Sequence, residues 1–85
     1  MYSRKISVRY QTAGGLQPCP IKWLDNFAMR NFTNDPIFDD TLPVNDGLIA
    51  VVSRVPLDRL KASMEDWFRR KMYLDKSSGL VVEEL

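Results

Sequence analysis

Residues 48–73 read LIAVVSRVPLDRLKASMEDWFRRKMY, and this stretch decides the fold class because it joins a strand pattern to a helix pattern. The run 48–52 is apolar and rich in β-branched side chains, which is typical of a strand in the centre of a sheet. Pro56 suits the first position of a helix, and apolar residues then recur at helical spacing to about Tyr73. The predicted core stripe of this second helix consists of Leu57, Leu60, Met64, Phe68 and Met72, with Trp67 at one edge.

Charged residues favour the same helix. Asp58 lies near its positive N-terminal end, and basic residues lie near its negative C-terminal end, so both complement the helix dipole. Glu65 precedes Arg69 by four residues, and Asp66 precedes Arg70 by four. Both pairs are therefore placed to attract each other across one helical turn.

The N-terminal segment predicts a strand. Residues 4–11 alternate, with Ile6, Val8 and Tyr10 on one face and polar side chains on the other, which is typical of a half-buried strand. Gly14 and Gly15 predict a turn after it. Residues 17–20 contain two prolines and predict an extended lead-in. A hairpin in which residues 16–21 pair with the first strand stays open as an alternative, which the prolines oppose.

A first helix is predicted from Pro20 to about Phe32. Its stripe at helical spacing consists of Ile21, Leu24, Ala28 and Phe32. Trp23 and Phe27 lie beside that stripe, so the apolar arc covers about half of the circumference of the helix. A helix that packs on one small core needs an apolar arc of only about 100°. The two rings therefore either complete the core under a loop or form an apolar patch for a partner.

Residues 33–47 are rich in Asn, Asp, Pro and Gly, and they predict a loop that is long enough to be functional. Residues 80–82 predict a last short strand. The order strand, helix, strand, helix, strand predicts a small α+β fold in which two helices pack on a three-stranded sheet. We expect residues 1–85 to form a single compact domain.

Composition excludes several kinds of site. The 85 residues include no histidine and one cysteine, Cys19. Without imidazole the usual catalytic triad, general base and zinc ligand sets cannot be built, and one cysteine excludes an internal disulfide. The phosphate-binding patterns GxxxxGK[ST] and GxGxxG are both absent around Gly14 and Gly15. We therefore expect no enzymatic activity, no cofactor and no metal.

The sequence also contains no apolar run long enough to span a membrane. Its basic first residues lead into an alternating stretch rather than into the apolar core of a signal peptide. A lone thiol without a disulfide suits a reducing compartment. We expect a cytoplasmic protein that does not bind membranes.

By elimination, the sequence favours a small non-enzymatic protein-interaction module, which acts as a regulator, inhibitor or accessory subunit by binding a larger protein assembly. Trp23, Phe27 and Trp67 are the expected contacts, because aromatic side chains are enriched at interface centres. The expected charged contacts are Arg4, Lys5, Arg9, Arg69, Arg70, Asp35, Asp39 and Asp40.

Three alternatives remain at this point. The first is a homodimer built on the same aromatic patch. The second is nucleic-acid binding by the basic residues of the first strand and the second helix, although Asp58, Glu65 and Asp66 interrupt the basic face of that helix. The third is a small enzyme that uses Cys19 or the aspartates of residues 33–47.

Overall fold

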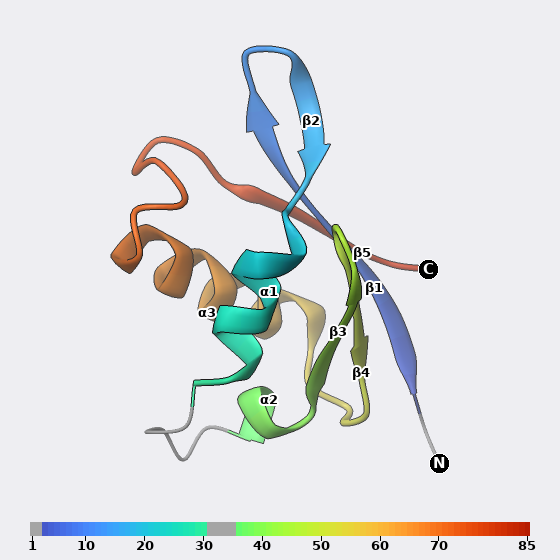
Figure 1. The fold of residues 1–85 in the computed structure, drawn as a ribbon. Coiled ribbons are helices and arrows are strands. Elements are labelled where there is room, and N and C mark those ends of the chain that lie inside the picture. Colours follow the sequence, from blue (N-terminus) through green and yellow to red (C-terminus); the bar gives the residue numbers. More distant parts are fainter. Residues whose placement is uncertain (1–2, 31–35) are drawn as a thin grey trace.

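The computed structural model describes residues 3–30 and 36–85, and Figure 1 shows the path of the chain. The elements in chain order are β1 (Arg4–Thr12), β2 (Gly15–Pro18), α1 (Ile21–Ala28), α2 (Pro36–Asp39), β3 (Thr41–Asn45), β4 (Leu48–Val51), α3 (Leu57–Arg70) and β5 (Leu80–Glu84). The predicted α+β class is confirmed. The predicted three-stranded sheet is wrong, because the described residues form a sheet of five strands.

All pairs of strands in the sheet are antiparallel. Neighbours run in the order β2-β1-β4-β3, and β5 also pairs with β1. Residues 4–7 of β1 pair with β4, residues 9–12 pair with β2, and residues 6–10 pair with β5. Because the β5 pairing overlaps both of the others, β5 lies along one edge of β1, and β2 and β4 lie end to end along the other edge.

Three backbone groups close the junction between β2 and β4. Val8 of β1 donates its N–H to the carbonyl of Gly47, which precedes β4, at 2.8 Å. Its own carbonyl accepts from the N–H of Cys19, which follows β2, at 3.0 Å. Gly47 also donates to the Cys19 carbonyl at 2.6 Å. The edge of β1 therefore stays hydrogen-bonded where its partner changes from one strand to the other.

Two predictions about strands are corrected. The hairpin alternative is the one that the protein adopts, because Pro18 lies at the end of β2, where the ladder stops. The segment 33–47 was predicted to be a loop, but it contains α2 and β3. Residues 33–35 of this segment lie outside the described ranges. The sequence of β3 does not predict a strand, because its five residues include Pro43 and Asn45, which favour turns.

Both long helices begin one residue after the proline that was predicted to open them, and they end earlier than expected. Pro20 and Pro56 are the N-caps of α1 and α3, and the last helical residues are Ala28 and Arg70. Beyond α3, Met72 adopts a left-handed backbone with φ 61° and is 89% exposed. The prediction that Met72 belongs to the core stripe of that helix is therefore wrong.

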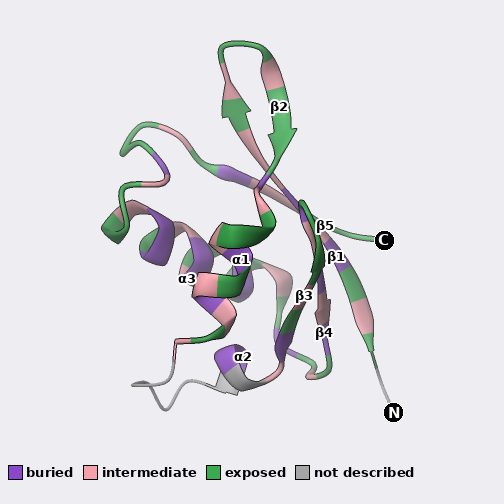
Figure 2. Ribbon diagram, viewed as in Figure 1, coloured by how far each residue is buried: buried purple, intermediate pink, exposed green. Residues whose placement is uncertain are grey.

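The core lies between α1 and α3 and one face of the sheet, where Figure 2 shows the buried positions. Even-numbered residues of β1 point toward the helices, and Ile6 and Val8 are completely buried. The buried residues that α1 and α3 contribute are Leu24, Phe27, Leu60, Met64, Trp67 and Phe68. In the described ranges, no helix is long and apolar enough to cross a membrane.

Candidate interaction surface

Trp23 of α1 is half-buried in a cluster of aromatic rings. Its ring stacks on Tyr73 with centroids 5.1 Å apart and planes 6° apart, and it lies 4.8 Å from Tyr10 and 5.6 Å from Phe68. Stacked and tilted pairs of this kind stabilise one another beyond the area that they bury. Trp23 thus joins α1 to β1 and to the segment that follows α3.

Phe27 is completely buried, with its ring 4.5 Å from Phe38 and 6.3 Å from Phe68. The ring of Phe38 comes from α2, which packs beside α1 and covers the side of α1 that carries Phe27. We therefore assign Phe27 to the core. The apolar side chains that α1 and its C-cap expose are instead Ile21 and Met29.

Trp67 of α3 is only 6% exposed, yet it lines a groove between α1 and α3. The indole N–H donates to Oδ1 of Asn26 at 3.1 Å. The guanidinium carbon of Arg30 lies 4.6 Å from the ring centroid, and Nζ of Lys71 lies 4.7 Å from it. The groove has a volume of about 320 Å³, and its walls are Lys22, Asp25, Asn26, Met29, Arg30 and Lys71.

Sequence reasoning found Trp67 but missed the residues of α1 that surround it. Lys22, Asn26 and Met29 follow one another at spacings of four and three residues, so they share one face of the helix. That stripe was visible in the sequence. Its position opposite Trp67, which follows Asn26 by 41 residues in the chain, depends on how α1 and α3 pack.

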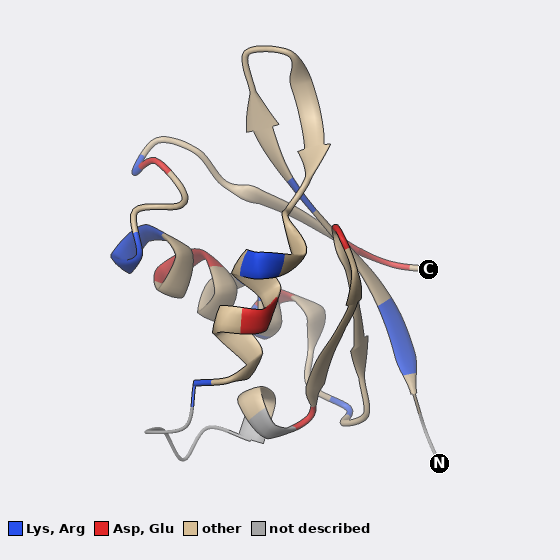
Figure 3. Cartoon of the chain, in the orientation of Figure 1, with Lys and Arg blue, Asp and Glu red and all other residues tan. Residues whose placement is uncertain are grey.

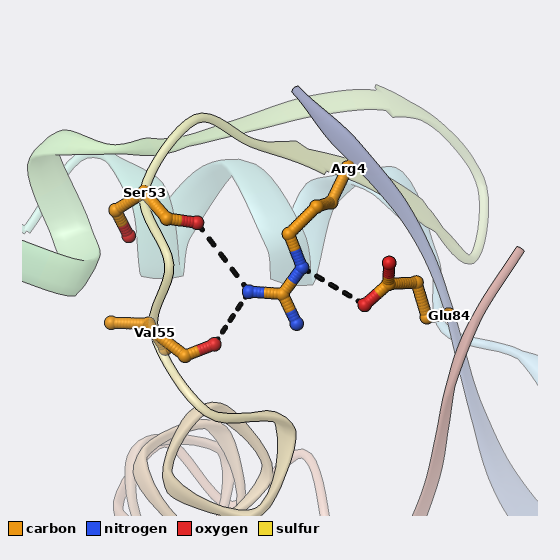
Figure 4. Close-up of polar contacts among 4 residues, drawn as sticks. All are labelled: Arg4, Ser53, Val55 and Glu84. Atoms are coloured by element: carbon orange, nitrogen blue, oxygen red, sulfur yellow. Dashed lines mark hydrogen bonds and ion pairs between the residues drawn. The ribbon is translucent and has the colours of Figure 1, made fainter. Parts of the chain in front are cut away.

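Arg4, expected to contact a partner, instead holds three parts of the chain together (Figure 4). Its Nε donates to Glu84 of β5 at 2.9 Å, and one terminal nitrogen donates to the carbonyls of Val55 at 2.5 Å and Ser53 at 3.4 Å. The side chain is 9% exposed. Arg4 therefore ties β1 to β5 and to the segment that leads into α3.

The other arginines that were expected to contact a partner are paired within the chain. Arg9 forms an ion pair with Glu83 on β5. Arg69 donates to the carbonyl of Ser78 at 2.7 Å and lies 4.0 Å from Glu65, which confirms the first predicted pair on α3. The second predicted pair is also confirmed, since Arg70 lies 3.3 Å from Asp66, and both side chains are well exposed.

The remaining charged contacts are scattered. Lys5 is exposed on β1, and Asp40 is a half-buried residue whose carbonyl accepts from the N–H of Val52 at 3.0 Å. Asp35 and the side chain of Asp39 lie outside the described residues. Figure 3 shows basic positions on β1 at one side of the molecule and at the C-terminal end of α3 at the other. The basic residues that were considered for nucleic acid therefore lie on two separate elements of the fold.

The sheet has a second face, turned away from the helices. Directly opposite residues in antiparallel strands point to the same side, so this face follows from the pairing of the odd-numbered residues of β1. We call it the open face; it comprises Leu16, Pro18, Lys5, Ser7, Arg9, Gln11, Leu48, Ala50, Leu42, Val81 and Glu83. Leu42 on β3 is 66% exposed, and Leu16 on β2 is 40% exposed.

Cys19 is buried at the junction of β2 and β4, and this burial raises the pKa of its thiol to about 12. A thiol acts as a nucleophile in its deprotonated form, so this environment disfavours nucleophilic chemistry at neutral pH. Within residues 3–30 and 36–85, no three acidic or cysteine side chains gather in a way that could hold a metal ion.

Comparison of the chain with protein-family models, with curated proteins and with solved structures found no match.

Proposed function

We propose that this chain is a small, non-enzymatic protein-interaction module that binds a larger protein through the open face of its sheet. The observation that carries the proposal is the group of apolar side chains on that face, of which Leu42 is 66% exposed. Apolar area that is removed from water on binding supplies the main driving force for association. Acting by occupation of a partner's surface, the module would serve as a regulator, inhibitor or accessory subunit.

The composition of the open face is suited to recognition. Leu42 and Ala50 lie opposite each other on β3 and β4, and Leu48 continues the apolar area along β4. The neighbouring strand β1 contributes exposed polar residues, among them Lys5. Apolar area beside polar and charged groups is typical of the interfaces of proteins that also exist apart from their partners.

The free edge of β3 is protected against pairing with an additional strand. The carbonyl of Asp40 accepts from Val52, so the even-numbered residues of β3 face β4, and Thr41 and Pro43 face the free edge. Proline has no N–H, so an added strand would lack a hydrogen-bond donor at that position. This arrangement favours a partner that docks on the face of the sheet over one that extends its edge.

The free edge of β5 is also partly occupied. Leu85 donates its N–H to the carbonyl of Lys5, so the odd-numbered residues face β1 and Leu80 faces outward. The N–H of Leu80 donates to Oε2 of Glu65 on α3 at 2.8 Å. A carboxylate on the first outward N–H of β5 competes with any strand that would pair there.

The experiment that tests this proposal places a photo-crosslinking amino acid at Leu42 in the living source cells. The same amino acid at Lys61, on the exposed side of α3, is the control. We expect a specific adduct with another protein from position 42 and none from position 61. The same adduct from both positions, or none from position 42, would overturn the proposal.

The partner protein that the adduct identifies is then purified, and its affinity for this chain is measured. The Leu42→Asp substitution places a charge in the proposed interface and should weaken binding about tenfold or more. Met72→Asp is the matched control, since Met72 is an exposed apolar residue that does not belong to the open face. Equal binding by the two variants would contradict the proposal. An adduct that contains two copies of this chain would instead support the homodimer.

A further inference from the structure

The groove between α1 and α3 has a property that the open face lacks, because nearly all of the polar groups in its walls are hydrogen-bond donors. Lys22 and Lys71 contribute two positive charges, and Asp25 contributes one negative charge. Ammonium and guanidinium groups donate and cannot accept. The groove therefore carries a surplus of donors and of positive charge, although the whole chain has a net charge of only +1.

The amide of Asn26 adds to this surplus. An indole N–H can only donate, so its bond with Asn26 requires the amide oxygen, at 3.1 Å. That contact leaves the NH₂ group of Asn26 to donate elsewhere, and Asn26 lines the groove. The packing of Trp67 thus determines which way round this amide is placed.

The cations are held by the rings beneath them. The guanidinium of Arg30 lies over both Trp67 and Phe38, at 4.6 Å and 4.7 Å from their centroids. Lys71 lies over Trp67. Cations that rest on aromatic faces lose less freedom when a ligand arrives, because their positions are already restricted.

We propose that this groove binds the carboxylate groups of an acidic segment of a partner protein. A carboxylate accepts several hydrogen bonds and pairs with both ammonium and guanidinium groups. Met29, which is 76% exposed at the rim, offers apolar contact to a side chain next to the acidic residue. The site lies on the helical side of the sheet, so it is independent of the open face and does not rest on the function proposed there.

One feature favours an acidic protein segment over a nucleic acid. The ring of Trp67 is 6% exposed and lies beneath cations, so it offers no free surface on which a base could stack.

The test uses hexaglutamate as the probe, with inorganic phosphate and a twelve-nucleotide thymidine strand as the other arms. Binding to the purified chain is followed by amide and indole NMR signals. We expect hexaglutamate to shift the side-chain signals of Asn26 and Trp67 in a saturable manner, and added salt to weaken the binding. No shift at these signals, or tighter binding of phosphate or of the oligonucleotide at the same signals, would overturn the proposal.

Variants with the same change in net charge separate a specific site from general attraction. Lys22→Gln combined with Lys71→Gln should weaken binding of hexaglutamate about tenfold, whereas Lys61→Gln combined with Lys76→Gln should change it less than twofold. Asp25→Asn should tighten binding, because it removes the negative charge from the groove. Equal losses in the two double variants would contradict a specific site. The amide spectrum of each variant serves as the check that it is folded.

Discussion

A Cβ atom on Gly47 would lie 2.5 Å from the Cβ of Pro18, closer than two carbon atoms of separate residues can approach without a clash. It would also lie 3.1 Å from the carbonyl oxygen of Val8. The backbone of Gly47 has φ 68°, which side chains of the L configuration rarely adopt. Glycine is therefore required at this junction for two separate reasons, the space and the backbone conformation.

We expect Gly47→Ala to lower the free energy of unfolding by about 2–4 kcal/mol, since it combines a left-handed conformation with overpacking. Urea denaturation measures the change. Gly14→Ala is the control, because a Cβ at Gly14 would meet its nearest neighbour, Oγ1 of Thr12, at an ordinary 3.7 Å. Equal losses in the two variants would contradict this account of the junction.

Arg4, whose side chain is only 9% exposed, should matter more to stability than an exposed arginine. Arg4→Met removes the donor to the carbonyl of Val55 and the partner of Glu84, and should lower the free energy of unfolding by about 2–3 kcal/mol. Arg70→Met breaks only an exposed pair with Asp66 and should change it by less than about 0.5 kcal/mol. Thermal and urea denaturation check both values. If Arg70→Met proved as damaging as Arg4→Met, the role of Arg4 as a tie between strands would be wrong.

Phe27 should behave as a core residue. Phe27→Ala removes a ring that packs on Phe38 and Phe68, and we expect a loss of about 3–5 kcal/mol in the free energy of unfolding. Met29→Ala changes an exposed side chain and should alter the stability by less than about 0.5 kcal/mol. A stable Phe27→Ala variant that has lost only its partner would show that Phe27 is a contact residue after all.

The thiol of Cys19 should make stability depend on pH in the alkaline range. Burial raises its pKa from 9.0 to about 12, so between these values the folded chain keeps a proton that the unfolded chain has lost. The free energy of unfolding therefore falls as the pH rises from 9.0 toward 12. Below 9.0 both states hold the proton, and this contribution is fully present.

Comparison with Cys19→Ala isolates the effect, because the two proteins differ only in this side chain. We expect the free energy of unfolding to fall less steeply with pH in the variant, as measured by urea denaturation below and above pH 9.0. Identical slopes would contradict the assignment. In the native protein at neutral pH, a thiol reagent should react with Cys19 far more slowly than it does in denaturant.

Much of the fold could be predicted from short stretches of sequence. Alternation identified β1, the apolar run identified β4, and helical spacing after Pro56 identified α3 with its two ion pairs. The fate of Phe27 could not be predicted in this way. Its burial depends on Phe38, which comes from a segment that was expected to be a loop, and no local pattern connects the two rings.

The sequence by itself determined the α+β class, the absence of histidine chemistry and the residues that begin both long helices, because each of these depends on composition or on neighbours along the chain. Only the tertiary structure decided that β2 and β4 share one edge of β1, and that Trp67 lies beneath Lys71 and opposite Asn26. The physical reason is that burial and charge at a site depend on which distant segments pack together. The periodicity of a segment shows which of its faces is apolar, but not what will cover that face.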